Sequence, residues 1–366
     1  MNGTFKIITL QQQIFAGFVT LLLGDQHSMI LKQDGSLWTT PMNLRGMDQH
    51  FKKHFSKLIP SGVIAAAAGS GFSIALKQDG GVWAIGRNYH GQLGDGSIIR
   101  KTELTLARTI PGAKSVSVGV DFTMVLTQHG KVWATGGDKH GQLGDGLHSY
   151  TTKFFMAVCT EAIAIASGDA HNILLNKGGS VWASGRNDYG QLGDGSKVDR
   201  GSYIKVMPHG AAHLAAGGYH SMVLKQDGSV WATGWNEYGQ LGDGLATDRT
   251  IYAKVVSDGV KSIAAGRRHS IVLKQDGSVL ACGYNENGQL GDGWKTNSHG
   301  FVEVIVDGVQ AIAAGAFHSM VVKKDGSIWA TGLNKNGQLG DGSTVSPKTF
   351  TELQLIGIGR RHDHVV

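Results

Sequence analysis

Residues 215–244 read AAGGYHSMVLKQDGSVWATGWNEYGQLGDG, and close copies of this stretch recur along the chain. The hexapeptide GQLGDG returns every 49 or 50 residues, and a second mark, a glycine followed three residues later by His or Phe, occurs seven times. Self-similarity at this period is typical of repeat architectures, so seven copies of one unit are predicted. The hexapeptides lie at 91–96, 141–146, 190–195, 239–244, 288–293 and 337–342, and the second mark lies at His27, Phe72, Phe122, His171, His220, His269 and His318.

Each unit contains four short runs with the composition of β-strands. The second and third runs are joined by Asp-Gly, which predicts a type I′ hairpin turn because both of its central residues need a positive φ. The GQLGDG segment separates the third run from the fourth. Examples of the first to fourth runs are VKSIAA at 260–265, SIVLKQ at 270–275, SVWATG at 229–234 and IYAKVV at 251–256.

Such a sheet is apolar on both faces and cannot stand alone in water, so each sheet must pack between two neighbours. Radial packing produces a propeller, whereas a β-solenoid has shorter repeats and needs polar caps. We therefore predict an all-β fold, a seven-bladed β-propeller of four-stranded antiparallel blades. One position of the third strand carries tryptophans that are expected to be buried between blades. These are Trp38, Trp83, Trp133, Trp182, Trp231 and Trp329, with Leu280 in the remaining copy.

The chain is expected to form one propeller domain over residues 1–366. The repeats cover about 10–356, and 357–366 form a short C-terminal tail. Copies of the fourth strand occur both near 10–14 and at 351–354, one more than seven blades require. The sequence leaves open which of the two completes the ring.

Composition excludes several classes of protein. The 55 glycines stand beside 5 prolines and a hydrophobic fraction of 41%, so the chain is neither collagen nor a disordered linker. The net charge of +6 is dispersed rather than gathered in a basic stripe, which argues against a specific nucleic-acid partner. No apolar run is long enough for a membrane span, and glutamines interrupt the N-terminal apolar segment, so no export is expected. We expect a monomer in the cytoplasm or the nucleus.

Histidines, glycine-rich loops and cysteines have structural explanations here. One His per blade is too far from the others to share a metal ion, so these side chains are expected to be buried and to bond backbone groups. GQLGDG lacks the Lys-Ser/Thr of a phosphate-binding loop, and we expect its glycines to adopt positive φ, its Leu to pack between blades and its Asp to close a turn. Cys159 and Cys282 occupy non-equivalent positions, which predicts neither a disulfide nor a zinc site. We predict no enzymatic activity, no cofactor and no metal.

One rim of the propeller is the candidate binding surface. In an antiparallel meander the connection after the first strand and the one after the third share a rim, and the units differ most from one another there. Variable residues before GQLGDG include Arg186 with Tyr189. Aromatic and arginine side chains on a rigid rim are typical of protein interface hot spots. The candidate partner-binding residues are Tyr219, Trp235, Tyr238, Arg267, Arg268, Tyr284 and Phe317.

The unit follows one pattern: Gly-x-x-His-Ser, then x-Leu-Lys-x-Asp-Gly, then Val-Trp-x-x-Gly-x-Asn-x-x-Gly-Gln-Leu-Gly. This pattern resembles the regulator of chromosome condensation repeat, and the resemblance covers most of the chain. The resemblance implies a seven-bladed propeller. Its members include the exchange factor for the Ran GTPase, domains attached to ubiquitin ligases and kinases, and a bacterial inhibitor of β-lactamase. The β-wedge tied to exchange activity has no room after the second unit here. We therefore expect a scaffold that binds a protein partner through the variable rim, with exchange activity on a Ran-like small GTPase as the alternative and inhibition of a secreted enzyme as a weaker third.

Overall fold

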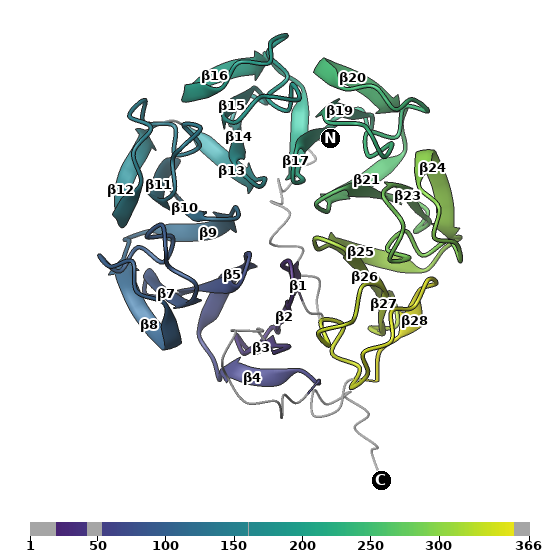
Figure 1. Cartoon of the computed structure of the whole chain (residues 1–366), viewed down its shortest axis with the longest axis horizontal. Helices are drawn as coiled ribbons and strands as arrows, with labels where there is room; N and C mark the ends of the chain where they lie inside the picture. Colours follow the sequence, from purple (N-terminus) through teal and green to yellow (C-terminus); the bar gives the residue numbers. More distant parts are fainter. Residues whose placement is uncertain (1–19, 42–52, 160, 355–366) are drawn as a thin grey trace, which may run out of the picture.

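Seven four-stranded antiparallel sheets stand around a central axis (Figure 1). The computed structural model describes residues 20–41, 53–159 and 161–354. Each sheet consists of four strands that follow one another in the chain, and the sheets, here called blades 1 to 7, follow the ring in chain order. Within the described ranges there is no helix, and so none that could cross a membrane. The predicted seven-bladed propeller is confirmed.

The strands have the following bounds. Blade 1 contains β1 (Thr20–Leu23), β2 (Ser28–Leu31), β3 (Leu37–Thr39) and β4 (Ser56–Ile59), blade 2 contains β5 (Val63–Ala68), β6 (Phe72–Lys77), β7 (Gly81–Gly86) and β8 (Lys101–Thr109), and blade 3 contains β9 (Ala113–Val118), β10 (Phe122–Thr127), β11 (Lys131–Gly136) and β12 (Thr151–Cys159). Blade 4 contains β13 (Ala162–Ser167), β14 (His171–Asn176), β15 (Val181–Gly185) and β16 (Arg200–Met207), and blade 5 contains β17 (Ala211–Ala216), β18 (His220–Lys225), β19 (Val230–Gly234) and β20 (Arg249–Val256). Blade 6 contains β21 (Val260–Ala265), β22 (His269–Lys274), β23 (Val279–Gly283) and β24 (Ser298–Ile305), and blade 7 contains β25 (Val309–Ala314), β26 (His318–Lys323), β27 (Ile328–Gly332) and β28 (Thr351–Glu352).

Burial along the strands explains the radial packing. In blade 5 the second strand, β18, is buried on both faces up to its last residue, whereas the outer strand, β20, has no fully buried residue and consists of half-buried and exposed side chains. The apolar side chains of one blade pack against those of the next. Leu224 and Val230 of blade 5, for example, share a buried cluster with Ile263 and Val272 of blade 6. The hydrophobic core is therefore divided among the seams between blades.

The GQLGDG loop fastens each blade to its neighbour. In blade 5, Leu241 is fully buried at the seam with blade 6, and its backbone N–H donates to Asn236 Oδ1 over 3.0 Å. Asn236 Nδ2 donates in turn to Asp243 Oδ1, and Asp243 forms a β-bridge with Gly300 on the outer strand of blade 6. All three glycines of each such loop have positive φ. The structural roles predicted for the loop are confirmed.

The Asp-Gly hairpins differ from the predicted type I′ turn. In blade 5 only Gly228 is left-handed, at φ 81°, and its N–H donates to the Lys225 carbonyl over 3.0 Å. Among the described residues His148 is the single non-glycine with positive φ, so Asp227 is not left-handed. The Asp227 carboxylate instead accepts hydrogen bonds from the backbone N–H and the hydroxyl of Ser229, at 2.9 and 2.6 Å. The result is a three-residue loop ending in a left-handed glycine, in which Asp is selected for its side-chain hydrogen bonds.

The ring closes through the C-terminal copy of the fourth strand. The segment predicted at 351–354 contributes β28, which pairs with β27 and completes blade 7. The copy predicted near 10–14 lies outside the described residues. Blade 7 then packs on blade 1 as any other pair does, with Met320 and Ile30 in one buried cluster. Every described blade is thus continuous in sequence.

The repeated tryptophans are only half-buried. Trp231 packs against the seam between blades 4 and 5, which confirms the predicted contact. Its outer part is covered by the Nζ of Lys225, which lies 4.0 Å from the ring centroid, and Lys323 covers Trp329 in the same way at 3.9 Å. The outward part of such a ring stays partly accessible and is shielded by the stem and the ammonium group of a lysine.

Candidate partner-binding rim

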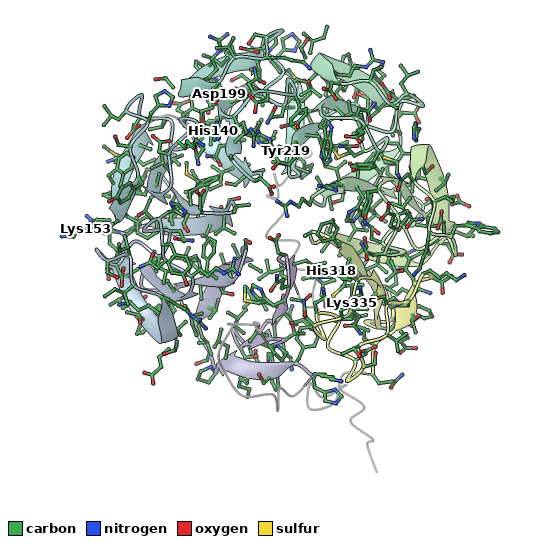
Figure 2. The ribbon with its side chains drawn as sticks, in the orientation of Figure 1. His140, Lys153, Asp199, Tyr219, His318 and Lys335 are labelled. Carbon is green, nitrogen blue, oxygen red and sulfur yellow. The ribbon has the colours of Figure 1, made fainter. Side chains whose placement is uncertain are left out.

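The rim opposite the Asp-Gly hairpins is built from two connections per blade. In blade 5 these are the turn that ends at Tyr219, beside the central opening in Figure 2, and the segment that starts at Trp235. A backbone hydrogen bond from Trp235 N–H to the Tyr219 carbonyl, 2.9 Å long, holds the two connections together. Blade 6 repeats it from Tyr284 N–H to the Arg268 carbonyl at 2.8 Å. Two variable positions are therefore placed next to each other on blades 5 and 6.

Six aromatic rings form a continuous row on this rim, which we call the aromatic belt. Centroids of contacting rings are 5.1 to 6.1 Å apart, mostly in edge-to-face geometry. Such pairs each stabilise by about 0.5–1.5 kcal/mol beyond simple burial, so the rings hold one another in place. The belt consists of Tyr189 on blade 4, Tyr219, Trp235 and Tyr238 on blade 5, Tyr284 on blade 6 and Phe317 on blade 7.

Two arginines stack on the belt. The guanidinium carbon of Arg186 lies 5.3 Å from the Tyr219 centroid, and its Nε donates to Asp188 at 2.6 Å. The guanidinium carbon of Arg268 lies 5.2 Å from the centroid of Trp235 and 5.3 Å from that of Tyr238. Cation–π contacts of this kind fix the orientation of a guanidinium without using its in-plane N–H donors.

A third arginine spans the mouth of the central channel. Arg267 of blade 6 donates from Nε to Asp169 of blade 4 at 3.0 Å and so passes over blade 5. The blade 5 residue beneath it is Gly218, where a Cβ would collide with the Arg267 side chain. Burial raises the pKa of Asp169, although the charge of Arg267 acts in the opposite direction. This ion pair braces the inner edge of the rim.

All seven predicted residues lie on this rim, and the structure brings them into one surface across blades 5 to 7. Their accessibility differs, since Trp235 is only 9% exposed and Arg267 is engaged within the chain, while the other five are half-buried. The set of candidates missed Arg186 and Tyr189, which extend the surface to blade 4. Their position in the sequence could have identified them, because Arg186 and Tyr189 precede GQLGDG in the neighbouring repeat as Trp235 and Tyr238 do in theirs.

The buried histidines bond differently from the prediction. His220 is fully buried, its Nε2 lies 2.9 Å from the hydroxyl of Ser270 on the next blade, and its Nδ1 has no hydrogen-bond partner among the described residues. Ser270 Oγ donates to the Gln240 carbonyl at 2.7 Å, so the hydroxyl must accept from a protonated Nε2. Burial lowers the pKa of His220 to about 4. The ring is therefore neutral at pH 7, and no group of three or more potential metal ligands occurs within the described ranges.

These observations define a closed seven-bladed propeller built from repeats of 49 or 50 residues. The sequence profile of the RCC1-like domain matches residues 46–365, and the chain belongs to this family. The resemblance to the regulator of chromosome condensation repeat is thereby confirmed. A search of curated protein sequences found no match.

Solved structures of the same fold are similar over most of their length. Human WBSCR16 superimposes with a TM-score of 0.74 at 22% identity, covering 83% of this chain and 85% of that chain. Yeast RCC1 (Prp20), solved with Kap60 bound, superimposes with a TM-score of 0.73 at 22% identity, covering 82% of this chain and 78% of that chain. Prp20p from Saccharomyces cerevisiae gives 0.70 at 21% identity, covering 81% and 80% of the two chains. At these identities the similarity shows the fold alone.

Proposed function

We propose that this chain is a protein-binding propeller that acts by binding rather than by catalysis, and that the aromatic belt is its partner-binding surface. The observation that carries the proposal is the contiguity of six rings and two stacked arginines on one rim. Tyrosine, tryptophan and arginine are the residues most enriched among interface hot spots. Because the rings already pack against one another, binding would immobilise few further side chains, which favours affinity.

The identity of the partner is a separate question, and the relatives supply the first probes. The structure of Prp20p from Saccharomyces cerevisiae was reported together with its binding to Gsp1p and histones. A Ran-like small GTPase and core histones are therefore the first proteins to test against this chain. Exchange activity would appear as accelerated nucleotide release from the GTPase at micromolar concentrations of the propeller.

The test compares variants of the rim in the cells that express the protein. Replacing both Trp235 and Tyr238 with Ala removes the centre of the belt, and we expect binding of the partner, identified by cross-linking and mass spectrometry, to weaken at least thirtyfold. Tyr89→Ala is the matched control, because Tyr89 is 64% exposed on the same rim of blade 2 and lies outside the belt. Equal retention of the partner by wild type and the double variant would overturn the proposal.

A further inference from the structure

Among the described residues, Arg268 is the arginine in contact with the belt that forms no ion pair with a carboxylate. Its guanidinium carbon lies 5.2 to 5.8 Å from the ring centroids of Trp235, Tyr238 and Tyr284. In the part of the chain that the structure describes, its Nε is buried and has no hydrogen-bond acceptor. The Glu286 carboxylate accepts a hydrogen bond from the Tyr284 hydroxyl at 2.7 Å, and within the described ranges no ion pair joins it to Arg268.

The two neighbouring arginines provide an internal comparison. Arg186 and Arg267 lie on the same rim, and each has a carboxylate of this chain within 2.6 to 3.0 Å. Arg268 occupies the middle of the row of rings instead, between blades 5 and 6. In the part of the chain that the structure describes, two of these three cations thus have a carboxylate partner, and the central one has ring contacts only.

Stacking leaves the donors of a guanidinium unused. The contacts with the rings use the charge of the Arg268 guanidinium and none of its N–H donors. Because its Nε is buried, the terminal Nη groups of this half-buried residue are the donors that an incoming acceptor can reach. A donor fork whose orientation is already fixed loses little entropy when an acceptor arrives, and charge-assisted bonds to a carboxylate are about twice as strong as neutral ones.

We propose that Arg268 anchors the carboxylate of an Asp or Glu side chain in a segment of a protein partner, with the belt packing against that segment. This inference rests on the proposed function, since it assumes that the belt is the binding surface. A carboxylate fits better than a phosphate, because the site offers one guanidinium, and the negative charge of Glu286, which is bonded to the Tyr284 hydroxyl, repels a dianion more strongly than a monoanion.

The experiment selects ligands for the intact protein from a displayed library of random dodecapeptides, without assuming a natural partner. Peptides are kept if their binding is lost in the Trp235→Ala variant. Each Asp and Glu of these peptides is then replaced by Asn or Gln and tested against wild type, Arg268→Gln and Arg268→Lys. Arg186→Gln is the matched control, since it removes a stacked arginine that already has a carboxylate partner.

We expect one acidic residue of the peptide to be coupled to Arg268. Replacing this acid should weaken binding of the peptide to wild type roughly tenfold or more and should not change its binding to Arg268→Gln. In Arg268→Lys, which keeps the charge but lacks the planar fork, the same replacement should weaken binding by less than in wild type. Arg186→Gln should preserve the preference for the acid. Peptides that depend on Trp235 but show no coupling to Arg268 would overturn this inference and leave the proposed function standing. If no selected peptide depends on Trp235, the proposed function fails and the inference fails with it.

Discussion

At the scale of single residues, the partner of each buried histidine is encoded one repeat later. In each repeat a His or Phe stands three residues after a regularly spaced glycine. Where this residue is His, the next blade has Ser directly after its own His or Phe. Where it is Phe, the next blade has Thr123 or Asn172 there. Thr123 and Asn172 donate to the same kind of Gln carbonyl as Ser270 does, without needing to accept from a histidine. The histidine–serine pairs are His27 with Ser73, His171 with Ser221, His220 with Ser270, His269 with Ser319, and His318 with Ser28.

Asp138 stands at a position where the surrounding groups favour the side chain of Asn over that of Asp. Five other blades have Asn at this position, whose amide nitrogen donates to the Asp of GQLGDG. Asp138 accepts from Leu143 N–H at 2.7 Å, but its second oxygen has no partner and faces Asp145. Burial, together with the charge of Asp145, raises the pKa of Asp138 from 3.8 to about 6.

We predict that Asp138→Asn stabilises the protein at pH 8 by about 1 kcal/mol. The folded-state pKa lies above the unfolded-state value, so protonation stabilises the fold at low pH, and this contribution is lost as the pH rises through about 6. The difference between variant and wild type should therefore shrink toward pH 4.5. Denaturant unfolding at both pH values measures it, with Asn236→Asp as the reverse control. A gain that does not depend on pH would contradict the assigned cause.

At the scale of elements, the strands were predictable and the details of their connections were not. The strand predicted at 260–265 coincides with β21, because alternation of apolar residues and flanking glycines mark its ends. The predicted type I′ conformation of the Asp227-Gly228 turn was wrong, because the hydrogen bonds that the Asp227 carboxylate accepts from Ser229 determine the conformation of this turn. The residues of the belt were identified by their variation between repeats, but their mutual contacts depend on side-chain directions that a sequence pattern does not contain.

The GQLGDG loop contributes to the seam through one leucine. We predict that Leu241→Ala lowers the free energy of unfolding by roughly 2–5 kcal/mol, because it leaves a cavity between blades 5 and 6. Leu245→Ala is the control, since Leu245 lies four residues further on and is 48% exposed. Its effect should stay within about 0.5 kcal/mol. Equal losses for the two variants, measured by urea unfolding, would show that the loop leucine does not hold the seam.

At the scale of the whole molecule, stability depends on a complete ring. Every blade has two apolar faces, and the seam between blades 7 and 1 contains the same kind of cluster as the others. Side chains at the seams are fully buried, as Ile271 on blade 6 and Ile30 on blade 1 illustrate. Interruption of the ring would expose two such faces at once.

We predict that a chain ending at Asp307, which lacks blade 7, aggregates. Removing this blade uncovers Ile271 of blade 6 and Ile30 of blade 1, which it packs against. A chain ending at Gln354 is the control, because it retains all the described strands. Size-exclusion chromatography and proteolysis report the outcome. A soluble, protease-resistant protein of six blades would show that closure is not required.

The backbone hydrogen bond between the two connections of blades 2 to 7 has an evolutionary consequence. It joins main-chain groups, as from Trp235 N–H to the Tyr219 carbonyl, and so does not depend on which side chains those positions carry. Side chains at these positions can therefore change while the hydrogen bond is kept, and new specificities can arise on an unchanged framework. Blades 1 to 3, which contribute no ring to the belt, would then be a reservoir on which a second recognition surface could evolve or be engineered.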